Sequence, residues 1–216
     1  MLSITIIIII INCLVSFTAF NNEKIFDELI FYPPAISSQN QYYRFFTCGF
    51  IHANYAHLFF NMYSLYVFGE AVETQFHGAF GENGKWLYLL MYISSLFFCL
   101  LPTYSKNRNN YNYRSLGASG AVSAVVFAFI FLDPLRSLSL IFLPKFGIPG
   151  FVFGFLYLVI SSAMDKRGGG NINHSAHIWG AIYGIAFLIV FGSFMATHPL
   201  LQDFIEKVQL YLKRLF

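Results

Sequence analysis

The sequence contains few charged residues. Asp, Glu, Lys and Arg make up 11% of its 216 residues, against about 25% in soluble domains. Hydrophobic residues reach 57%, and 27 Phe and 14 Tyr are more typical of lipid-facing surfaces and interfacial belts than of a soluble core. The net charge of +3 is small and no Lys/Arg cluster occurs, so the charge pattern predicts no nucleic-acid partner. This composition predicts a membrane protein.

Cysteine is also scarce. Cys13, Cys48 and Cys99 lie far apart in apolar surroundings, and no CxxC pair occurs. This spacing predicts small unpaired hydrophobic residues, and neither a disulfide framework nor a metal site. No internal repeat and no second domain is visible. We therefore expect one membrane domain over residues 1–196, followed by a tail over residues 197–216.

Long apolar runs suggest an all-α membrane protein with six transmembrane helices. A spanning helix needs about 17–25 mainly apolar residues. Runs that approach or meet this length occur at about 4–20, 49–70, 86–103, 117–132, 147–164 and 175–195. The first run could pass for the apolar part of a signal peptide, but it lacks a basic segment before it and a good cleavage site after it. We expect it to be an uncleaved first helix.

The tail and the loops give the remaining organisation. Residues 197–216 place apolar side chains at helical spacing with Lys207, Lys213 and Arg214 between them, which predicts an amphipathic helix along the membrane surface. The basic residues of the loops are divided almost equally between the two sides of a six-span protein. The positive-inside rule therefore gives no orientation.

Two polar clusters interrupt the apolar runs: GASG at Gly117–Gly120 and HSAHIWGAIYG at His174–Gly184. In a six-span protein the starts of spans two, four and six share one membrane face. That face carries His52, His57 and Asn61 from span two, Ser119 from span four, and His174 and His177 from span six. Polar groups inside a spanning segment are costly and indicate function by default. We expect these side chains to lie together at similar depth.

A serine and a histidine on different spans suggest nucleophilic catalysis. A serine hydroxyl is a weak nucleophile until a neighbouring base, usually His, accepts its proton. No Asp or Glu lies inside a span near Ser119 or His177, so a Ser–His dyad is favoured over a Ser–His–Asp triad. Taken alone, each residue also fits a structural role, since Gly-x-Ser-Gly is ordinary in packed membrane helices and a single His more often bonds helices together. Their occurrence on one face favours the catalytic interpretation.

Glycines would bring the two helices together. His177, Gly180 and Gly184 share one helix face, and a stripe of small residues allows close packing in lipid. Gly117 and Gly120 bracket Ser119 and could accept that approach. The fourth span is short, since 16 residues rise roughly 24 Å against a hydrocarbon core of about 30 Å. Its serine end would therefore be recessed in a cavity that water can fill.

An anionic tetrahedral intermediate would also need hydrogen-bond donors. His57 and Asn61 share one face of the second span, and the backbone N–H of Ser119 would be a third donor. His52 lies off that face and is expected to be a structural polar residue. We expect His174 to face the aqueous loop.

Together, HANYAHLFFN, GASG and HIWGAIYG resemble the signature of the rhomboid family of intramembrane serine proteases, over residues of about 40–195. The resemblance implies a six-helix rhomboid core, with Ser119 as nucleophile, His177 as general base, and His57, Asn61 and the Ser119 amide as oxyanion donors. It implies substrates that are membrane-anchored proteins, cut where their transmembrane segment unwinds near a small residue. It also implies that no metal or organic cofactor is needed.

One position departs from that family. Four residues after the nucleophile the family often has a Tyr that packs against the catalytic imidazole, and here the residue is Ser123. Two hypotheses follow: either another aromatic ring covers His177, or the dyad is looser than usual.

Two other functions fit parts of the sequence. A non-catalytic rhomboid relative would bind and escort membrane clients, but such relatives usually lack the serine or the histidine. A small transporter could use His52, His57 and His177 as a proton relay, but intramembrane carboxylates or broken helices in repeated halves would then be expected. Composition and an early first helix favour a bacterial plasma membrane, with the site opening to the extracytoplasmic side. The substrate and the oligomeric state are not indicated by the sequence.

Overall fold

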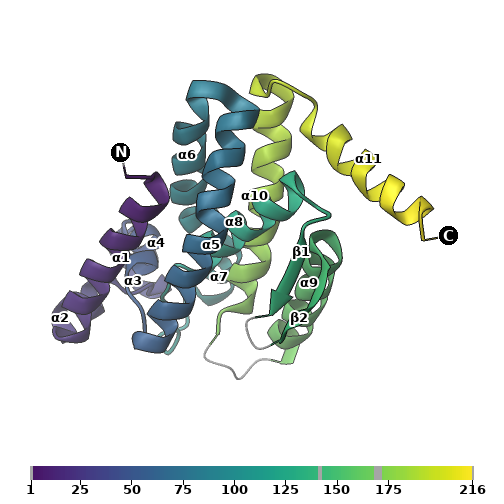
Figure 1. Ribbon diagram of the computed structural model, residues 1–216. Coiled ribbons are helices and arrows are strands. Elements are labelled where there is room, and N and C mark those ends of the chain that lie inside the picture. The colour runs from purple at the N-terminus through teal and green to yellow at the C-terminus, as the bar shows by residue number, and fades with distance from the viewer. Residues whose placement is uncertain (1, 141–142, 168–171, 216) are drawn as a thin grey trace.

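The computed structural model describes residues 2–140, 143–167 and 172–215 and is mostly helical. Each predicted run overlaps one of the main helices in Figure 1. These are α1 (Ile4–Phe20), α5 (Tyr55–Phe80), α6 (Gly84–Phe98), α8 (Ser119–Leu132), α9 (Gly150–Arg167) and α10 (His174–Met195). Shorter helices are α2 (Glu23–Leu29), α3 (Pro33–Gln39), α4 (Arg44–Thr47), η1 (Cys48–Phe50), η2 (Gly81–Asn83), α7 (Leu101–Asn107) and α11 (Leu200–Lys213).

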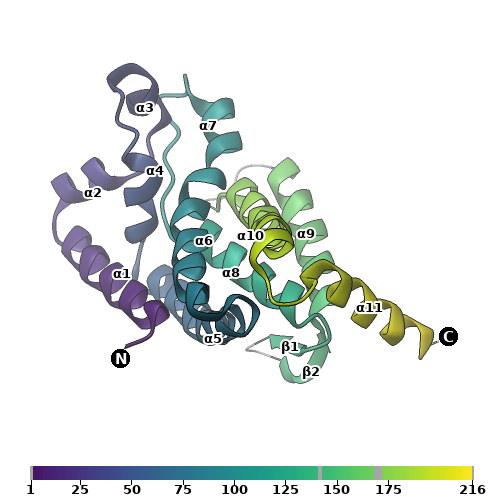
Figure 2. The ribbon, with the colours of Figure 1, turned by 90° about the horizontal axis from the view of Figure 1, so that it is seen from above.

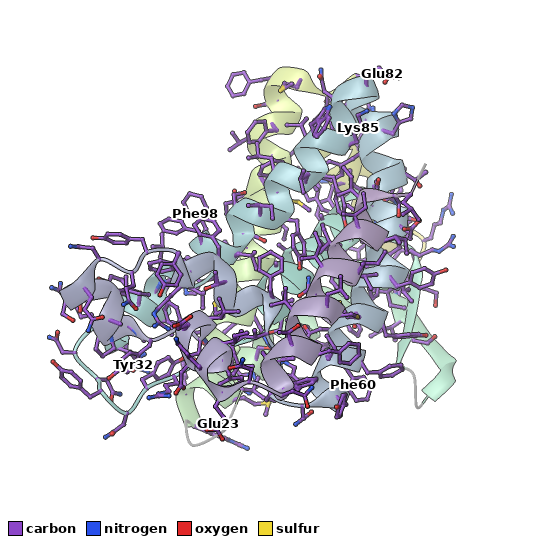
Figure 3. The ribbon with its side chains drawn as sticks, turned by 90° about the vertical axis from the view of Figure 1, so that its left-hand side faces the viewer. Glu23, Tyr32, Phe60, Glu82, Lys85 and Phe98 are labelled. Atoms are coloured by element: carbon purple, nitrogen blue, oxygen red, sulfur yellow. The ribbon has the colours of Figure 1, made fainter. Side chains whose placement is uncertain are left out.

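Among the described residues, two helical stretches are long and apolar enough to cross a membrane by length and composition alone. They are Tyr55–Asn107, which contains α5 to α7, and His174–Met195, which is α10. The apolar helices α1 and α8 are shorter than that test requires. Charged Glu82 and Lys85 lie at one end of the molecule and Glu23 lies at the other, as Figure 3 shows. This arrangement fits a bundle whose middle faces lipid, whereas the count of six spans stays a prediction.

Helix α8 is the centre of the bundle. It packs against α5, α6, α9 and α10, and the two views of the ribbon both place it among them (Figures 1 and 2). Most of its side chains are buried, as expected for a helix that is apolar on all sides. Its 14 residues correspond to a length of about 21 Å, less than the roughly 30 Å of a hydrocarbon core. The shortness expected of this helix is confirmed.

The contact between α8 and α10 is unusually close. A Cβ added to Gly180 would overlap the carbonyl oxygen of Gly120, and one added to Gly184 would overlap the carbonyl oxygen of Ala124. In both cases the obstacle is backbone, which cannot rotate away as a side chain can. Only hydrogen therefore fits at the two α10 positions, and Gly120, Gly180 and Gly184 lie at this close contact between the helices.

Helix α1 is fixed to α5 by a carboxylate at its N-terminus. The side chain of Glu73 accepts hydrogen bonds from the backbone N–H groups of Ile4 (2.8 Å) and Thr5 (3.0 Å). These N–H groups have no acceptor within the helix, and a negative charge at this end is favoured by the helix dipole. The Thr5 hydroxyl also lies 2.9 Å from that of Tyr88 in α6. Three helices are thus joined at the end of the bundle where α1 begins.

The second span differs from its predicted limits. Helix α5 begins at Tyr55 because the side chain of Asn54 caps it, accepting from the His57 N–H at 2.8 Å. It continues to Phe80, where Gly81 adopts a φ of +59° and ends it. The helix therefore extends ten residues beyond the predicted end of the run at residue 70. Its last turns carry polar side chains of the kind that are typical of loops.

A two-stranded antiparallel sheet of β1 (Ser137–Leu140) and β2 (Leu143–Pro149) joins α8 to α9. The expectation of an all-helical chain is therefore incomplete. The alternation of Ser and Leu at 137–140 has the period of two that favours a strand, but four residues are too few to be distinguished from a loop. The first long connection likewise contains α2, α3 and α4, which were not predicted.

Helix α11 leaves the bundle at an angle (Figures 1 and 2). Its Phe204 stacks on Phe131 of α8 at 5.1 Å between ring centroids, and its Tyr211 packs edge-on against Phe151 of α9. The predicted tail helix is present over Leu200–Lys213. Its place along a membrane surface stays a prediction.

Candidate active site

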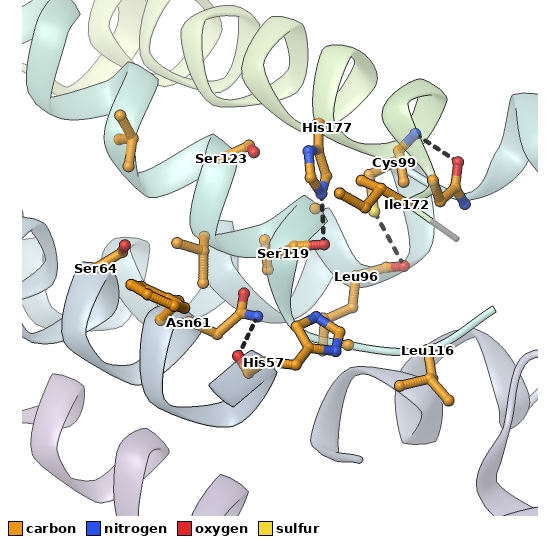
Figure 4. Close-up of a pocket in the computed structure, with 18 of the residues that line it drawn as sticks. His57, Asn61, Ser64, Leu96, Cys99, Leu116, Ser119, Ser123, Ile172 and His177 are labelled. Atoms are coloured by element: carbon orange, nitrogen blue, oxygen red, sulfur yellow. Dashed lines mark hydrogen bonds between the residues drawn. The ribbon is translucent and has the colours of Figure 1, made fainter. Parts of the chain in front are cut away.

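The starts of α5, α8 and α10 surround one pocket of about 590 Å³. Its lining residues include His57 and Asn61 of α5, Ser119 of α8 and His177 of α10. Figure 4 shows these four side chains directed toward the same space. The convergence expected from counting spans is thus present for these four side chains, whereas His52 and His174 are not among the residues that line this pocket.

Ser119 and His177 are in direct contact. Nε2 of His177 lies 2.7 Å from Oγ of Ser119 (Figure 4), which is a short, well-formed hydrogen bond. Ser119 is the first residue of α8, and His177 lies in the first turn of α10. Because Ser119 opens its helix, its backbone N–H has no acceptor within that helix. A nucleophile, a base and a backbone donor therefore lie together, while their catalytic roles remain predictions.

Asn173 connects the segments that carry these two residues. Its Oδ1 accepts from the Ala176 N–H (3.0 Å) and from the Thr103 hydroxyl of α7 (3.2 Å), and its Nδ2 donates to Oγ of Ser115 (3.4 Å). The first bond is an N-cap of α10. Ser115 lies just before the start of α8. Sequence reasoning missed this residue, although an Asn immediately before a helix is a recognisable capping signal.

Gly117 has a different role from the one expected. It precedes α8, adopts a φ of +112°, and donates its N–H to the Cys48 carbonyl at 2.8 Å. A Cβ at this position would stand 2.7 Å from Cε1 and 2.9 Å from Nε2 of His57. Gly117 therefore does not pack α8 against α10. It allows the chain to turn and the His57 ring to approach the residues before Ser119.

His57 and Asn61 line the pocket, and each already uses part of its hydrogen-bonding capacity within the protein. Nδ1 of His57 accepts from the Ala53 N–H at 3.4 Å, so the proton of a neutral ring is on Nε2, the nitrogen that faces Gly117. Asn61 is 93% buried, since its exposed fraction is 7%. Its Nδ2 donates to the carbonyl of His57 at 2.9 Å within α5. One N–H of this amide group is left for a ligand in the pocket.

His52 is fully buried beside this site. Its Nδ1 lies 2.9 Å from the hydroxyl of Ser16 in α1, and its ring packs edge-on against that of His57 at 5.0 Å between centroids. Its Nε2 has no hydrogen-bond partner among the described residues. His52 thus joins α1 to the segment before α5, and its structural role stays a prediction.

His174 is the first residue of α10, and its expected orientation toward the aqueous loop stays a prediction. It is half-buried and its ring packs edge-on against the ring of His177, with 5.9 Å between centroids. An aromatic ring other than the family's usual Tyr therefore contacts the imidazole. Because the Ser119–His177 distance is also short, the geometry supports the first hypothesis about Ser123 and not a loose dyad.

Ser123 has a partner that the sequence did not indicate. Its hydroxyl lies 3.1 Å from that of Tyr157 in α9, and both residues line the pocket. Buried Cys48 and Cys99 also line it, and Cys99 packs against Gly120. Within the described residues, no group of three or more His, Cys, Asp or Glu side chains is placed to hold a metal ion.

Comparison with protein-family models matches residues 39–194 to the Rhomboid domain. Rhomboid-like protein 11, chloroplastic, from Arabidopsis thaliana is 29% identical over 167 residues, which cover 71% of this chain and 54% of that protein. RHOMBOID-like protein 12, mitochondrial, from the same plant is 29% identical over 151 residues, which cover 62% of this chain and 42% of that protein.

The chain thus spans about half the length of the curated relatives it matches. Their names are chloroplastic and mitochondrial, so they do not support the bacterial plasma membrane that the composition favoured. The family match and the apolar helices indicate a membrane protein. Because the matched domain covers more than half of the sequence, the chain belongs to the rhomboid family.

Proposed function

We propose that this protein is an intramembrane serine endopeptidase that cleaves the transmembrane segments of membrane-anchored proteins. The observation that carries the proposal is the 2.7 Å contact between Nε2 of His177 and Oγ of Ser119 inside a pocket. A non-catalytic relative that escorts membrane clients would have no need of this contact. The retained serine and histidine therefore favour the enzyme over the escort.

In the first half of the reaction, Oγ of Ser119 attacks the carbonyl carbon of the scissile peptide bond. Nε2 of His177 accepts the hydroxyl proton and then donates it to the departing amine, which leaves an acyl-enzyme. In the second half, His177 accepts a proton from water, and the resulting hydroxide attacks the ester. The proton returns to Ser119 Oγ as the carboxylic acid product leaves.

Three groups are suited to bind the negative oxygen of the intermediates. They are the N–H of Ser119 at the start of α8, the Nε2–H of His57 and the remaining amide N–H of Asn61. Each removed donor of this kind typically costs about 10²–10³ in rate. The helix start adds a favourable partial positive charge at the same place.

Water must reach the site for the second half of the reaction. Helix α8 is only about 21 Å long, so a bilayer of ordinary thickness would leave its serine end below the membrane surface. The pocket above Ser119 is lined by polar Asn54, Ser115 and Asn173 as well as apolar residues. A recess with such a lining could admit the water that hydrolysis needs. A proton relay through His52 and His57 would need a hydrogen bond between them, whereas their rings pack edge-on at 5.0 Å between centroids.

The nucleophile can be tested with a serine-reactive fluorophosphonate probe on detergent-solubilised protein. The wild-type protein is expected to be labelled at Ser119, whereas Ser119→Ala and His177→Ala are not. Ser37→Ala, which removes a hydroxyl bonded to Pro34 and Arg108 carbonyls far from the pocket lining, is the matched control and should label normally. Equal labelling of Ser119→Ala would remove the proposed nucleophile.

We also propose that α11 lies along the membrane surface. The exposed apolar side chains on one of its faces include Leu201, Ile205 and Leu212, while Lys207, Lys213 and Arg214 supply basic groups on the other side. Such a helix buries its apolar face among lipid headgroups. Substituting Ile205→Gln and Leu212→Gln should expose α11 to added protease in liposomes, and unchanged protection would contradict this placement.

A further inference from the structure

Ser123 lies one helical turn after Ser119 on the same face of α8 (Figure 4). The side chain of Tyr157, from the neighbouring helix α9, meets that of Ser123, with 3.1 Å between the two hydroxyl oxygens. Gly154 lies at the contact between α9 and α8, where a Cβ would stand 3.3 Å from the side chains of Phe127 and Ile130. The hydroxyl pair therefore lies in the pocket wall one turn deeper than Ser119.

The surroundings of this pair are aromatic. The wall contains Phe60 and Phe68 of α5, Phe127 of α8 and Phe153 of α9. The ring of Tyr157 lies between two of them, at 5.5 Å from Phe127 and 6.4 Å from Phe153 between centroids. Two packed neighbours hold the ring in place, so its hydroxyl has a fixed position in a mainly apolar wall.

We infer that Tyr157 and Ser123 determine specificity: they favour substrates that place a hydroxyl-bearing side chain against this wall. The inference rests on the proposed function. One of the two hydroxyl protons serves the bond between the pair, and because both residues line the pocket, the rest of their hydrogen-bonding capacity is offered to a bound substrate. A Thr side chain can both donate to and accept from them. A Val side chain of nearly the same shape leaves them unpaired, which a buried polar site penalises.

A purely structural role would have another signature. If the Ser123–Tyr157 bond only held α8 and α9 together, its loss would slow the cleavage of every substrate by the same factor. If the pair determines specificity, its loss changes the ratio of the kcat/KM values of a hydroxyl-bearing and an apolar substrate. The kcat/KM of the apolar substrate then stays nearly unchanged. The ratio is therefore the measurement that separates the two roles.

The experiment uses the full chain in liposomes with paired transmembrane substrates. The pairs differ only by Thr or Val at one of the positions around the cleavage site, which is located by mass spectrometry. For the wild type we expect one position at which Thr is preferred over Val by roughly tenfold in kcat/KM, the effect of about one unpaired buried hydroxyl. In Tyr157→Phe and Ser123→Ala that ratio should fall to about 1 to 3.

Tyr183→Phe is the matched control. The Tyr183 hydroxyl donates to Ser94 at 2.7 Å and so joins α10 to α6, but neither residue lines the described pocket. This variant also loses an interhelical tyrosine hydroxyl, and it should keep the wild-type Thr/Val ratio. Thermal unfolding of both Tyr variants shows whether each is folded.

Three results would overturn the inference: no position with a Thr preference in the wild type, an unchanged ratio in Tyr157→Phe, or equal slowing of both substrates by that variant. Failure of the proposed function looks different. In that case no substrate is cut faster by the wild type than by Ser119→Ala, and the specificity inference is lost with it.

Discussion

Gly180 offers the most quantitative test of how the fold produces the site. Replacing it with Ala adds a methyl group that would overlap the carbonyl oxygen of Gly120 and stand 2.9 Å from its carbonyl carbon. An ordinary contact between a methyl group and backbone atoms needs about 3.5 Å or more. Because the obstacle is backbone, the two helices must move apart. The methyl carbon would stand 2.0 Å from the oxygen, so even a tight contact of about 3 Å requires a shift of at least about 1 Å.

That shift bears directly on the dyad. Gly180 lies three residues after His177 on α10, and Gly120 immediately follows Ser119 on α8. Moving these backbones apart by about 1 Å would lengthen the 2.7 Å contact beyond hydrogen-bond distance. A misplacement of this size can cost about 10²-fold in rate. Overpacking of this kind also typically costs about 1–3 kcal/mol in the free energy of unfolding.

The assay is the rate of fluorophosphonate labelling at Ser119, followed by cleavage of a transmembrane substrate in liposomes. Gly78→Ala is the matched control, because Gly78 is also within a helix but a Cβ there meets nothing within 4 Å. Replacing a helical Gly with Ala in open space is neutral or stabilising by about 0.5–1 kcal/mol. If Gly180→Ala labels as fast as Gly78→Ala, close approach of the helices is not what brings the base to the nucleophile.

Three further variants test the remaining parts of the site. Asn173→Ala should lower the free energy of unfolding by about 1–2 kcal/mol through the lost N-cap, and it should slow the labelling of Ser119. Asn173→Asp keeps the oxygen that caps the helix and should therefore be more stable than Asn173→Ala. Equal stability of the two variants in thermal unfolding would contradict the capping role. Asn61→Ala should lower kcat by about 10²–10³ with little change in KM, and a steady-state measurement showing an effect on KM alone would argue against an oxyanion role. Gly117→Ala should destabilise the protein by about 1–3 kcal/mol through backbone strain and should reduce cleavage by displacing His57. A variant with the melting temperature and the cleavage rate of the wild type would show that the turn is not strained.

The sequence was sufficient for the parts that depend on long patterns. Apolar runs located the main helices, and the order of those runs along the chain predicted that Ser119 and His177 lie close together, as their 2.7 Å contact shows. The small-residue stripe of α10 indicated its close packing, because glycines three and seven residues after His177 share its helix face and leave room there for a second backbone. These inferences depend on the spacing of apolar residues and on the order of the helices along the chain. Neither changes when a helix end is misplaced by a few residues.

Other features depend on contacts between distant segments and leave little trace in the sequence. Tyr157 is one of 14 tyrosines, and nothing in its neighbourhood identifies it as the partner of Ser123. His174 follows a Gly-rich segment, which predicts a residue that faces the loop, and nothing in the sequence indicates that its ring contacts that of His177. Gly117 looked like a packing residue because its φ of +112° cannot be read from composition. Tertiary contacts decide each of these positions.

The central claim is that Ser119 and His177 together hydrolyse peptide bonds within a membrane. The most direct measurement is the cleavage rate of a transmembrane substrate in liposomes by the purified wild-type protein, by Ser119→Ala and by His177→Ala. The proposal predicts cleavage by the wild type and rates at the no-enzyme background for both variants. Cleavage by Ser119→Ala at the wild-type rate, or no cleavage of any transmembrane substrate by a wild-type protein that the probe labels, would contradict it.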